Sequence, residues 1–210
     1  PPIADFVKEK LYEDQGLHCE VAKLKMDFMT RAQSLIHGDL HTGSIFINEE
    51  STKVFDPEFC FYGPMGYDIG NVIANMIFAW ANGDAAGAAD FCKWVEDVLV
   101  DVINMTKEKM EKYYDEHVTD TMCRNELYKK YYMDTIIEDT SAVAGLELIR
   151  RIVGMANVKD ITTIADEAKR ARAEKICITA AIDFIKNRSD KKCGKCFLKT
   201  LKDAIAEVDA

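Results

Sequence analysis

Proline, histidine and positive charge are scarce in this sequence of 210 residues. Only 4 prolines and 11 glycines are present, which excludes collagen-like and low-complexity architectures. Lysine and arginine number 27 against 36 aspartates and glutamates, so the formal net charge is −9. Nucleic acids and anionic membrane surfaces attract basic proteins, so we expect neither a nucleic acid nor a membrane as a partner.

Long hydrophobic runs are also missing. The longest apolar stretch, residues 72–81, is about half the length that a membrane-spanning helix needs. The N-terminus has neither the apolar segment of a signal peptide nor an initiator methionine, so we expect a piece of a longer protein.

Cysteine is present, but in a pattern that does not suggest a disulfide framework. The 7 cysteines are scattered and odd in number, which favours free thiols in a reducing compartment and hence a cytoplasmic location. Cys193 and Cys196 form a Cys-x-x-Cys motif, but no further zinc ligands lie near it in the sequence. We therefore expect two free thiols there as well.

The hydrophobic residues present, 48% of the chain, suffice for one core. Apolar residues at steps of three and four predict that the first 35 residues are helical. Short β-type runs at 45–47 and 53–55 predict a hairpin, flanked by irregular stretches at 35–44 and 56–66. Helices are expected from Tyr67 onward, with Thr106 starting one of them. Breaks are predicted near residues 82–84, 105–106, 139–140, 157–159 and 189–192. The fold class is therefore mainly α with a small β-hairpin, in a single domain.

Acidic residues flank the predicted hairpin on both sides. His37-Gly38-Asp39 precedes it, and Asp56-Pro57-Glu58 follows it. A hairpin returns the chain to its starting point, so we expect the carboxylates of Asp39, Asp56 and Glu58 to converge. Converging carboxylates repel one another unless a cation neutralises them or one acts as a base, and Mg²⁺ fits such a site best.

The same histidine-rich stretch raises one alternative, a metallohydrolase centre. His37, Asp39 and His41 follow a His-x-Asp-x-His pattern that can bind two metal ions. Such centres need several further histidines, and only His18 and His117 remain. We therefore prefer a structural role for His37, and for His41 we leave open whether it contacts a substrate or braces the loop.

Three strings resemble a known family. They are His-Gly-Asp-Leu-His-Thr-Gly-Ser-Ile at 37–45, Asp-Pro-Glu-Phe-Cys-Phe-Tyr-Gly-Pro-Met-Gly-Tyr-Asp-Ile-Gly at 56–70 and Leu-Ile-Arg-Arg-Ile-Val-Gly at 148–154. They are similar to the aminoglycoside- and choline-kinase-like small-molecule kinases, and most closely to the methylthioribose kinase family. The resemblance implies that residues 1–210 form the C-terminal catalytic lobe of a protein-kinase-like (α+β) fold, with its catalytic and metal loops in residues 35–70.

The resemblance also assigns site residues. Asp39 corresponds to the catalytic aspartate, which contacts the attacking hydroxyl. Asp56 and Glu58 correspond to the pair that holds Mg²⁺ on the phosphates of ATP. Arg150 and Arg151 correspond to arginines that bind the sugar and the transferred phosphoryl group.

Supporting roles follow from the same comparison. His37 and Asp68 are expected to hold the catalytic loop. Ser44 stands where kinases usually place a metal-binding asparagine, so we assign it to structural support. We also expect a guanidinium group of Arg150 or Arg151 to face the Asp39 cleft, with Asp39 and Glu58 as its acidic partners.

The implied reaction is ATP-dependent phosphorylation of the anomeric hydroxyl of 5-methylthioribose, a step of methionine salvage. A related choline or aminoglycoside kinase and a non-catalytic interaction module remain as alternatives. The first 35 residues contain no glycine-rich loop, so the N-terminal ATP-grasping lobe is expected to lie outside this chain, which alone should be inactive. The family also tends towards homodimers, for which the sequence itself carries no signal.

Overall fold

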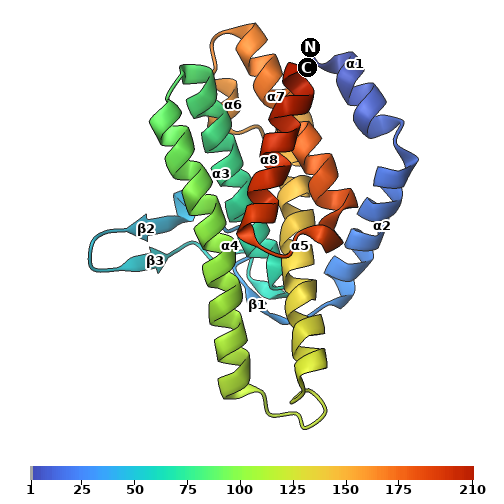
Figure 1. Cartoon of the computed structure of the whole chain (residues 1–210), viewed down its shortest axis with the longest axis vertical. Helices are drawn as coiled ribbons and strands as arrows, with labels where there is room; N and C mark the ends of the chain where they lie inside the picture. Colours follow the sequence, from blue (N-terminus) through green and yellow to red (C-terminus); the bar gives the residue numbers. More distant parts are fainter. Residues whose placement is uncertain (1) are drawn as a thin grey trace.

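Helices make up most of the chain in the computed structural model, which describes residues 2–210 (Figure 1). This agrees with the predicted fold class. Their bounds are α1 Ala4–Val7, the π-helical turn η1 Lys8–Tyr12, α2 Gln15–Thr30, α3 Gly66–Ala86, α4 Ala89–His117, α5 Glu126–Val153, α6 Lys159–Thr162, α7 Glu167–Lys186, the 3₁₀ turn η3 Arg188–Asp190 and α8 Gly194–Asp209. In the described chain, no helix is both long enough and apolar enough to cross a bilayer.

Two of the predicted helix breaks are wrong, and a third is displaced. Helix α4 continues through Thr106, and α5 continues through residues 139–140. Thr140 is fully buried, and its hydroxyl donates to the carbonyl of Ile136 at 2.9 Å, so the helix satisfies this polar side chain internally. The break predicted near residues 82–84 exists but lies slightly later, because α3 ends at Ala86 and is followed by Gly87, which has a φ of 76°. The breaks near residues 157–159 and 189–192 are confirmed.

Two short antiparallel strand pairs interrupt the helices. Strands β2 (Ile45–Ile47) and β3 (Thr52–Val54) form the predicted hairpin, with Phe46 opposite Lys53. Strands β1 (Ser34–Ile36) and β4 (Phe61–Gly63) also pair, although the sequence predicted helix up to residue 35 and irregular chain at 35–44 and 56–66. Each contains only three residues, too few to show an alternating pattern. Their pairing brings together the two loops that flank the hairpin.

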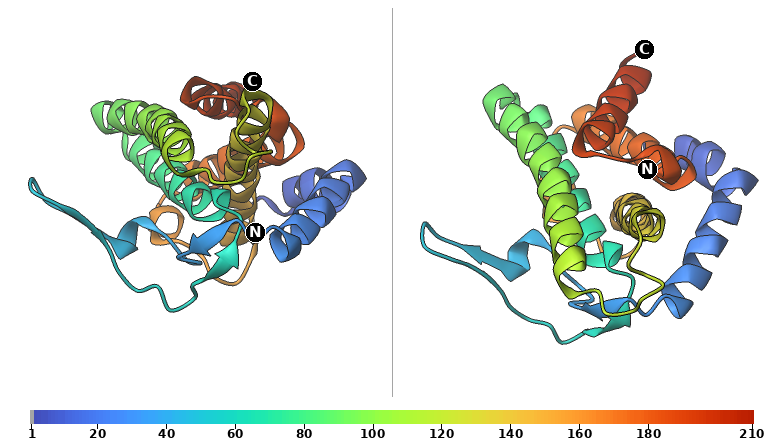
Figure 2. Two further views of the ribbon diagram at one scale, coloured as in Figure 1. Left: turned by 90° about the horizontal axis from the view of Figure 1, so that it is seen from below. Right: turned by 60° about the horizontal axis from the view of Figure 1, so that its bottom comes forward.

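The core lies between α3, α4, α5, α7 and α8. Its fully buried side chains come from all five helices and include Ile73, Ile77, Leu99, Leu148, Phe184, Phe197 and Leu201. The hairpin projects away from this bundle on one side, and α2 lies on the other side of α5 (Figure 2).

Helices α3 and α5 are in close contact at two glycines of α3. A Cβ atom on Gly70 would lie 2.7 Å from the carbonyl oxygen of Thr140, and one on Gly66 would lie 2.6 Å from that of Ile136. Only glycine allows this approach. The contact fixes the start of α3 against α5, and the candidate site is built from both helices.

Candidate active site

Asp68, in the first turn of α3, holds the loop that follows β1. Its two carboxylate oxygens accept the backbone N–H groups of His37 at 2.6 Å and of Gly38 at 3.0 Å. Hydrogen bonds to a charged acceptor are stronger than those between neutral groups. The position of the His37-Gly38-Asp39 segment is therefore set by the N-terminus of α3.

His37 connects this loop to the other side of the hairpin. Its Nε2 lies 2.8 Å from the carbonyl oxygen of Phe55, and its Nδ1 accepts the backbone N–H of Asp39 at 3.3 Å. These two contacts suit the tautomer that carries its hydrogen on Nε2. Gly38 has a φ of 85°, and a Cβ there would collide with the carbonyl of Phe59. The two loops thus touch along their backbones.

Ser44 and His41 contact each other within the same loop. The Ser44 hydroxyl lies 3.1 Å from Nε2 of His41, and the Ser44 carbonyl accepts the N–H of Phe55 at 3.1 Å. Ser44 is buried, with 3% of its surface exposed. These contacts hold both residues within the loop.

The three predicted carboxylates are free of protein partners in the part of the chain that the structure describes. Asp39 is half-buried, whereas Asp56 and Glu58 are exposed. Within residues 2–210, none of these three side chains takes part in a hydrogen bond or an ion pair. Asp56 also has a φ of 68°, a conformation that aspartate tolerates better than most residues.

The predicted convergence of all three carboxylates is not found. No group of three acidic, histidine or cysteine side chains in the described part of the chain lies close enough to hold a metal ion. The strand pairing brings the loop backbones together, but every residue from 51 to 60 is exposed.

Arg150 and Arg151 share one buried acid, Glu147. Nε of Arg150 donates to Oε2 of Glu147 at 2.8 Å, and Nε of Arg151 donates to Oε1 at 2.6 Å. Asp39 and Glu58, which we expected as their partners, do not pair with them. The reason is local, because Glu147 lies three and four residues earlier on the same face of α5.

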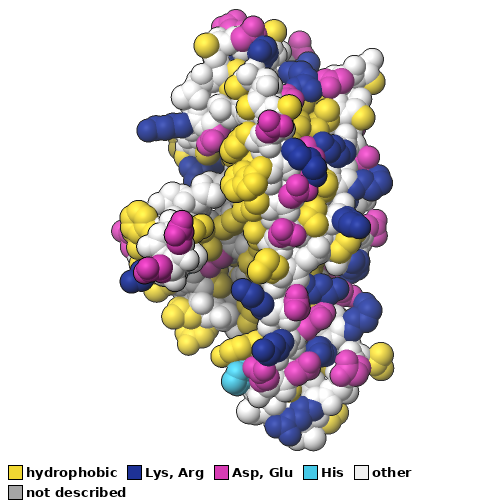
Figure 3. Space-filling view, turned by 60° about the vertical axis from the view of Figure 1, so that its left-hand side comes forward, with side chains coloured by type: hydrophobic (Ala, Val, Ile, Leu, Met, Phe, Trp, Pro, Cys, Tyr) yellow, Lys and Arg dark blue, Asp and Glu magenta, His cyan; other side chains and the backbone are white. Residues whose placement is uncertain are grey.

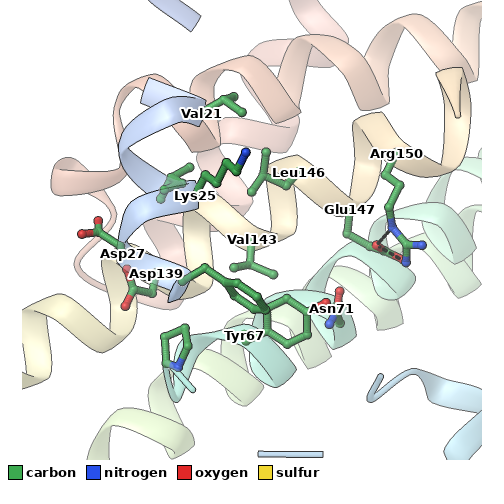
Figure 4. Close-up of a pocket in the computed structure, with 13 residues that line it drawn as sticks. Val21, Lys25, Asp27, Tyr67, Asn71, Asp139, Val143, Leu146, Glu147 and Arg150 are labelled. Carbon is green, nitrogen blue, oxygen red and sulfur yellow. Dashed lines mark hydrogen bonds and ion pairs between the residues drawn. The ribbon is translucent and has the colours of Figure 1, made fainter. Parts of the chain in front are cut away.

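A cavity of about 310 Å³ lies between α2, α3 and α5, and Glu147 and Arg150 form part of its wall (Figure 4). Apolar side chains such as Val21, Val143 and Leu146 line most of the rest. The cavity therefore combines an apolar surface with charged side chains of both signs, Lys25 and Arg150 against Asp27, Asp139 and Glu147.

Tyr67 also lines this cavity and connects it electrostatically with the loop. Burial raises the pKa of the Tyr67 hydroxyl, the positive charge of Arg150 opposes this effect, and the negative charges of Glu147 and Asp39 add to it. Tyr67 is therefore within electrostatic range of both the cavity wall and the Asp39 loop.

Two residues of this site, Glu147 and Tyr67, were missed by the sequence reasoning. Glu147 could have been found, because an acid three and four residues before two arginines on a helix is a known pairing pattern. Tyr67 has no such local signal, since its place depends on how α3 packs against α5.

Comparison with known proteins agrees with the resemblance of the two loops. Residues 7–99 match the family described as "Phosphotransferase enzyme family". The chain is 37% identical to methylthioribose kinase 1 of Oryza sativa over 89% of its own length and 47% of that protein. It is 36% identical to a methylthioribose kinase of Bacillus pumilus, over 85% of the chain and 44% of that protein, and 33% identical to one of Escherichia coli, over 89% and 48%.

These similarities confirm the family resemblance predicted from the motifs. They also show that the chain spans about half the length of the curated relatives it matches.

Proposed function

We propose that this chain is the C-terminal half of a small-molecule kinase of the methylthioribose kinase type. With the rest of the protein, it would transfer the γ-phosphoryl group of ATP to the anomeric hydroxyl of 5-methylthioribose. The O–P bond to the sugar forms as the bond to the ADP oxygen breaks, and the hydroxyl proton leaves. The free thiols of all 7 cysteines fit the proposed cytoplasmic setting of methionine salvage.

The observation that carries the proposal is the fixed backbone of the loop around Asp39. Asp68 and His37 fix its backbone from two sides, yet the Asp39 carboxylate keeps no protein partner among residues 2–210. Phosphoryl transfer depends mainly on position and charge. A carboxylate on a fixed backbone with a free acceptor is suited to orient a sugar hydroxyl and accept its proton.

Asp56 and Glu58 fit a magnesium ion that arrives with a nucleotide. Mg²⁺ bound to ATP needs one or two protein carboxylates, while phosphate oxygens and water supply the other ligands. Two exposed carboxylates without protein partners on one short loop meet that requirement. When bound, the ion would neutralise charge on the phosphates. Ser44 is buried and bonded to His41, so we do not include it among the ligands.

The cavity between α2, α3 and α5 suits a sugar with an apolar substituent. Its apolar lining can hold a methylthio group, and Arg150 at its wall can donate to sugar or phosphoryl oxygens.

Exposed apolar side chains around the hairpin support the presence of a second lobe. Leu35, Phe46, Ile47, Phe59 and Tyr62 each expose more than half of their surface, from 58% to 75%. In Figure 3, hydrophobic side chains (yellow) gather on the part of the molecule that projects at the left of the view. Large exposed apolar patches mark interaction surfaces. We propose that the part of the protein that corresponds to the N-terminal half of the relatives covers these residues.

The test uses the longer protein that contains this chain. Asp39→Asn should lower kcat for methylthioribose by at least about 100-fold, the scale of general-base loss, while ATP binding persists. Asp101→Asn, which changes an exposed acid of α4, is the matched control and should keep normal turnover. Normal turnover of the Asp39→Asn protein would remove Asp39 from catalysis. Phosphorylation of choline in place of methylthioribose would refute the proposed substrate.

A further inference from the structure

Two of the seven cysteines are in direct contact. Cys193 is the residue that precedes α8, and Cys196 lies in the first turn of that helix. Their Sγ atoms are 3.3 Å apart. A disulfide bond is about 2.05 Å long, so a small side-chain rotation is enough to join them. Both side chains are half-buried and therefore reachable from solvent.

The backbone around the two thiols is fixed by its neighbours. The N–H of Gly194 donates to Oδ1 of Asn104 at 2.9 Å, and a Cβ on Gly194 would collide with the carbonyl of Val100. Just before the motif, Nζ of Lys191 donates to Asp183 at 2.6 Å, and Nζ of Lys192 donates to Glu138 at 2.9 Å. The thiols are therefore held near each other by α4, α5 and α7.

The electrostatic setting favours reactivity of one thiol. Partial burial works to raise the pKa of Cys196, but the Cys193 thiol, the backbone N–H groups nearby and the charge of Lys191 outweigh it, so this pKa lies below its ordinary value. The thiolate is the form that attacks disulfides. By contrast, complete burial raises the pKa of Cys177.

We propose that Cys193 and Cys196 form a dithiol site that is converted to an intramolecular disulfide by small-molecule disulfides. The Cys196 thiolate attacks one sulfur of the oxidant, forms a mixed disulfide and releases one thiolate. The Cys193 thiolate then attacks Sγ of Cys196 and releases the second. The two cysteines lose two electrons and two protons, and the oxidant is reduced to two thiols.

A zinc site does not account for the pair. Structural zinc takes four protein ligands and catalytic zinc three, whereas no third acidic, histidine or cysteine side chain in residues 2–210 completes a metal-binding group here. Two thiols without further ligands are instead suited to disulfide formation and to trivalent arsenicals, which bridge two neighbouring sulfurs.

The test treats the 210-residue chain with oxidised glutathione and maps the products by mass spectrometry. We expect a peptide that links Cys193 to Cys196, formed several-fold faster than glutathione adducts at Cys19 and Cys60, the two exposed cysteines. The variant Cys193→Ser should stop at a mixed disulfide on Cys196, because the second attack is lost.

A second probe, phenylarsine oxide, needs no oxidation. It should bind the unmodified chain with one equivalent at this site and should not bind the Cys193→Ser variant there. If the variant does not fold, mapping of the wild-type products alone decides. The absence of the Cys193–Cys196 linkage, or faster reaction at Cys19 and Cys60, would overturn the proposal. Because no step depends on phosphoryl transfer, failure here leaves the proposed kinase function untouched.

Discussion

Replacement of Glu147 by glutamine tests the arrangement of the arginine pair. Glu147 is 5% exposed and accepts from Nε of Arg150 at 2.8 Å and from Nε of Arg151 at 2.6 Å. A second donor of Arg150, Nη2, lies 2.7 Å from Oε2 of Glu147. The change Glu147→Gln keeps the size of the side chain but removes its charge and turns one acceptor into a donor.

The two ion pairs differ in what their loss should cost. The Arg151 side chain is 19% exposed, so its pair with Glu147 is largely buried, and breaking a buried pair costs about 3–5 kcal/mol. The Arg150 side chain is 51% exposed, so solvent screens its pair, which contributes about 1 kcal/mol at most. Glutamine still accepts one hydrogen bond, worth about 1–2 kcal/mol. We expect Glu147→Gln to lower the free energy of unfolding by about 2–4 kcal/mol.

Urea unfolding of the chain measures this loss, with Glu108→Gln as the control. Glu108 is an exposed residue of α4, and its replacement should change the free energy of unfolding by less than about 0.5 kcal/mol. In a double-mutant cycle with Arg151→Gln, the two losses should not add, since each removes the same pair. Equal stability of the Glu147→Gln and Glu108→Gln proteins, or full additivity in the cycle, would refute the reasoning.

Two further predictions concern packing and pH. Gly70→Ala should lower the free energy of unfolding by about 1–3 kcal/mol, because a Cβ would lie 2.7 Å from the Thr140 carbonyl oxygen. Gly16→Ala is the control: its Cβ would lie 3.2 Å from the Asp14 carboxylate, so thermal unfolding should show a smaller loss of stability. Partial burial works to raise the pKa of Asp183, but hydrogen bonds from Asn187, Lys191 and Thr200 outweigh it, so this pKa lies below its unfolded value. The carboxylate therefore stabilises the fold completely above about pH 4, and this contribution is lost as pH falls through the folded pKa. The Asp183→Asn protein should therefore lose less stability between pH 5 and pH 2 (about the range of carboxyl titration) than the wild type, and an unchanged acid dependence would contradict this.

The helices were predictable where apolar spacing decides them. The stripe of Phe197, Leu201, Ile205 and Val208 on α8 faces the core as its spacing requires. Helix breaks were harder to predict, because Thr140 and Thr106 are polar residues, and whether a helix continues through them depends on packing and on hydrogen bonds within the helix. Strands β1 and β4 lie beyond such reasoning, since three residues carry too little pattern and the paired residues are 25 to 29 positions apart in the sequence, from Ile36 with Phe61 to Ser34 with Gly63.

The candidate site, too, was predictable only in part. The motifs located the two loops, and the hairpin argument placed them side by side, as the contact of Gly38 with Phe59 shows. The side chains were not predictable in this way, because adjacent loop backbones do not fix where side chains point: residues 51–60 are exposed, and no group of three acidic, histidine or cysteine side chains in the described residues lies close enough to hold a metal ion.

The geometry of the site depends on one helix contact. Asp68 at the start of α3 sets the position of the Asp39 loop, and Glu147 near the end of α5 sets the position of Arg150. Gly70 joins these helices between the two points. Any change that separates α3 from α5 must therefore move the proposed base relative to the proposed phosphoryl-binding arginine. Since catalysis by positioning is sensitive to displacements of about 1 Å, Gly70→Ala should reduce turnover of the longer protein even at temperatures where it remains folded.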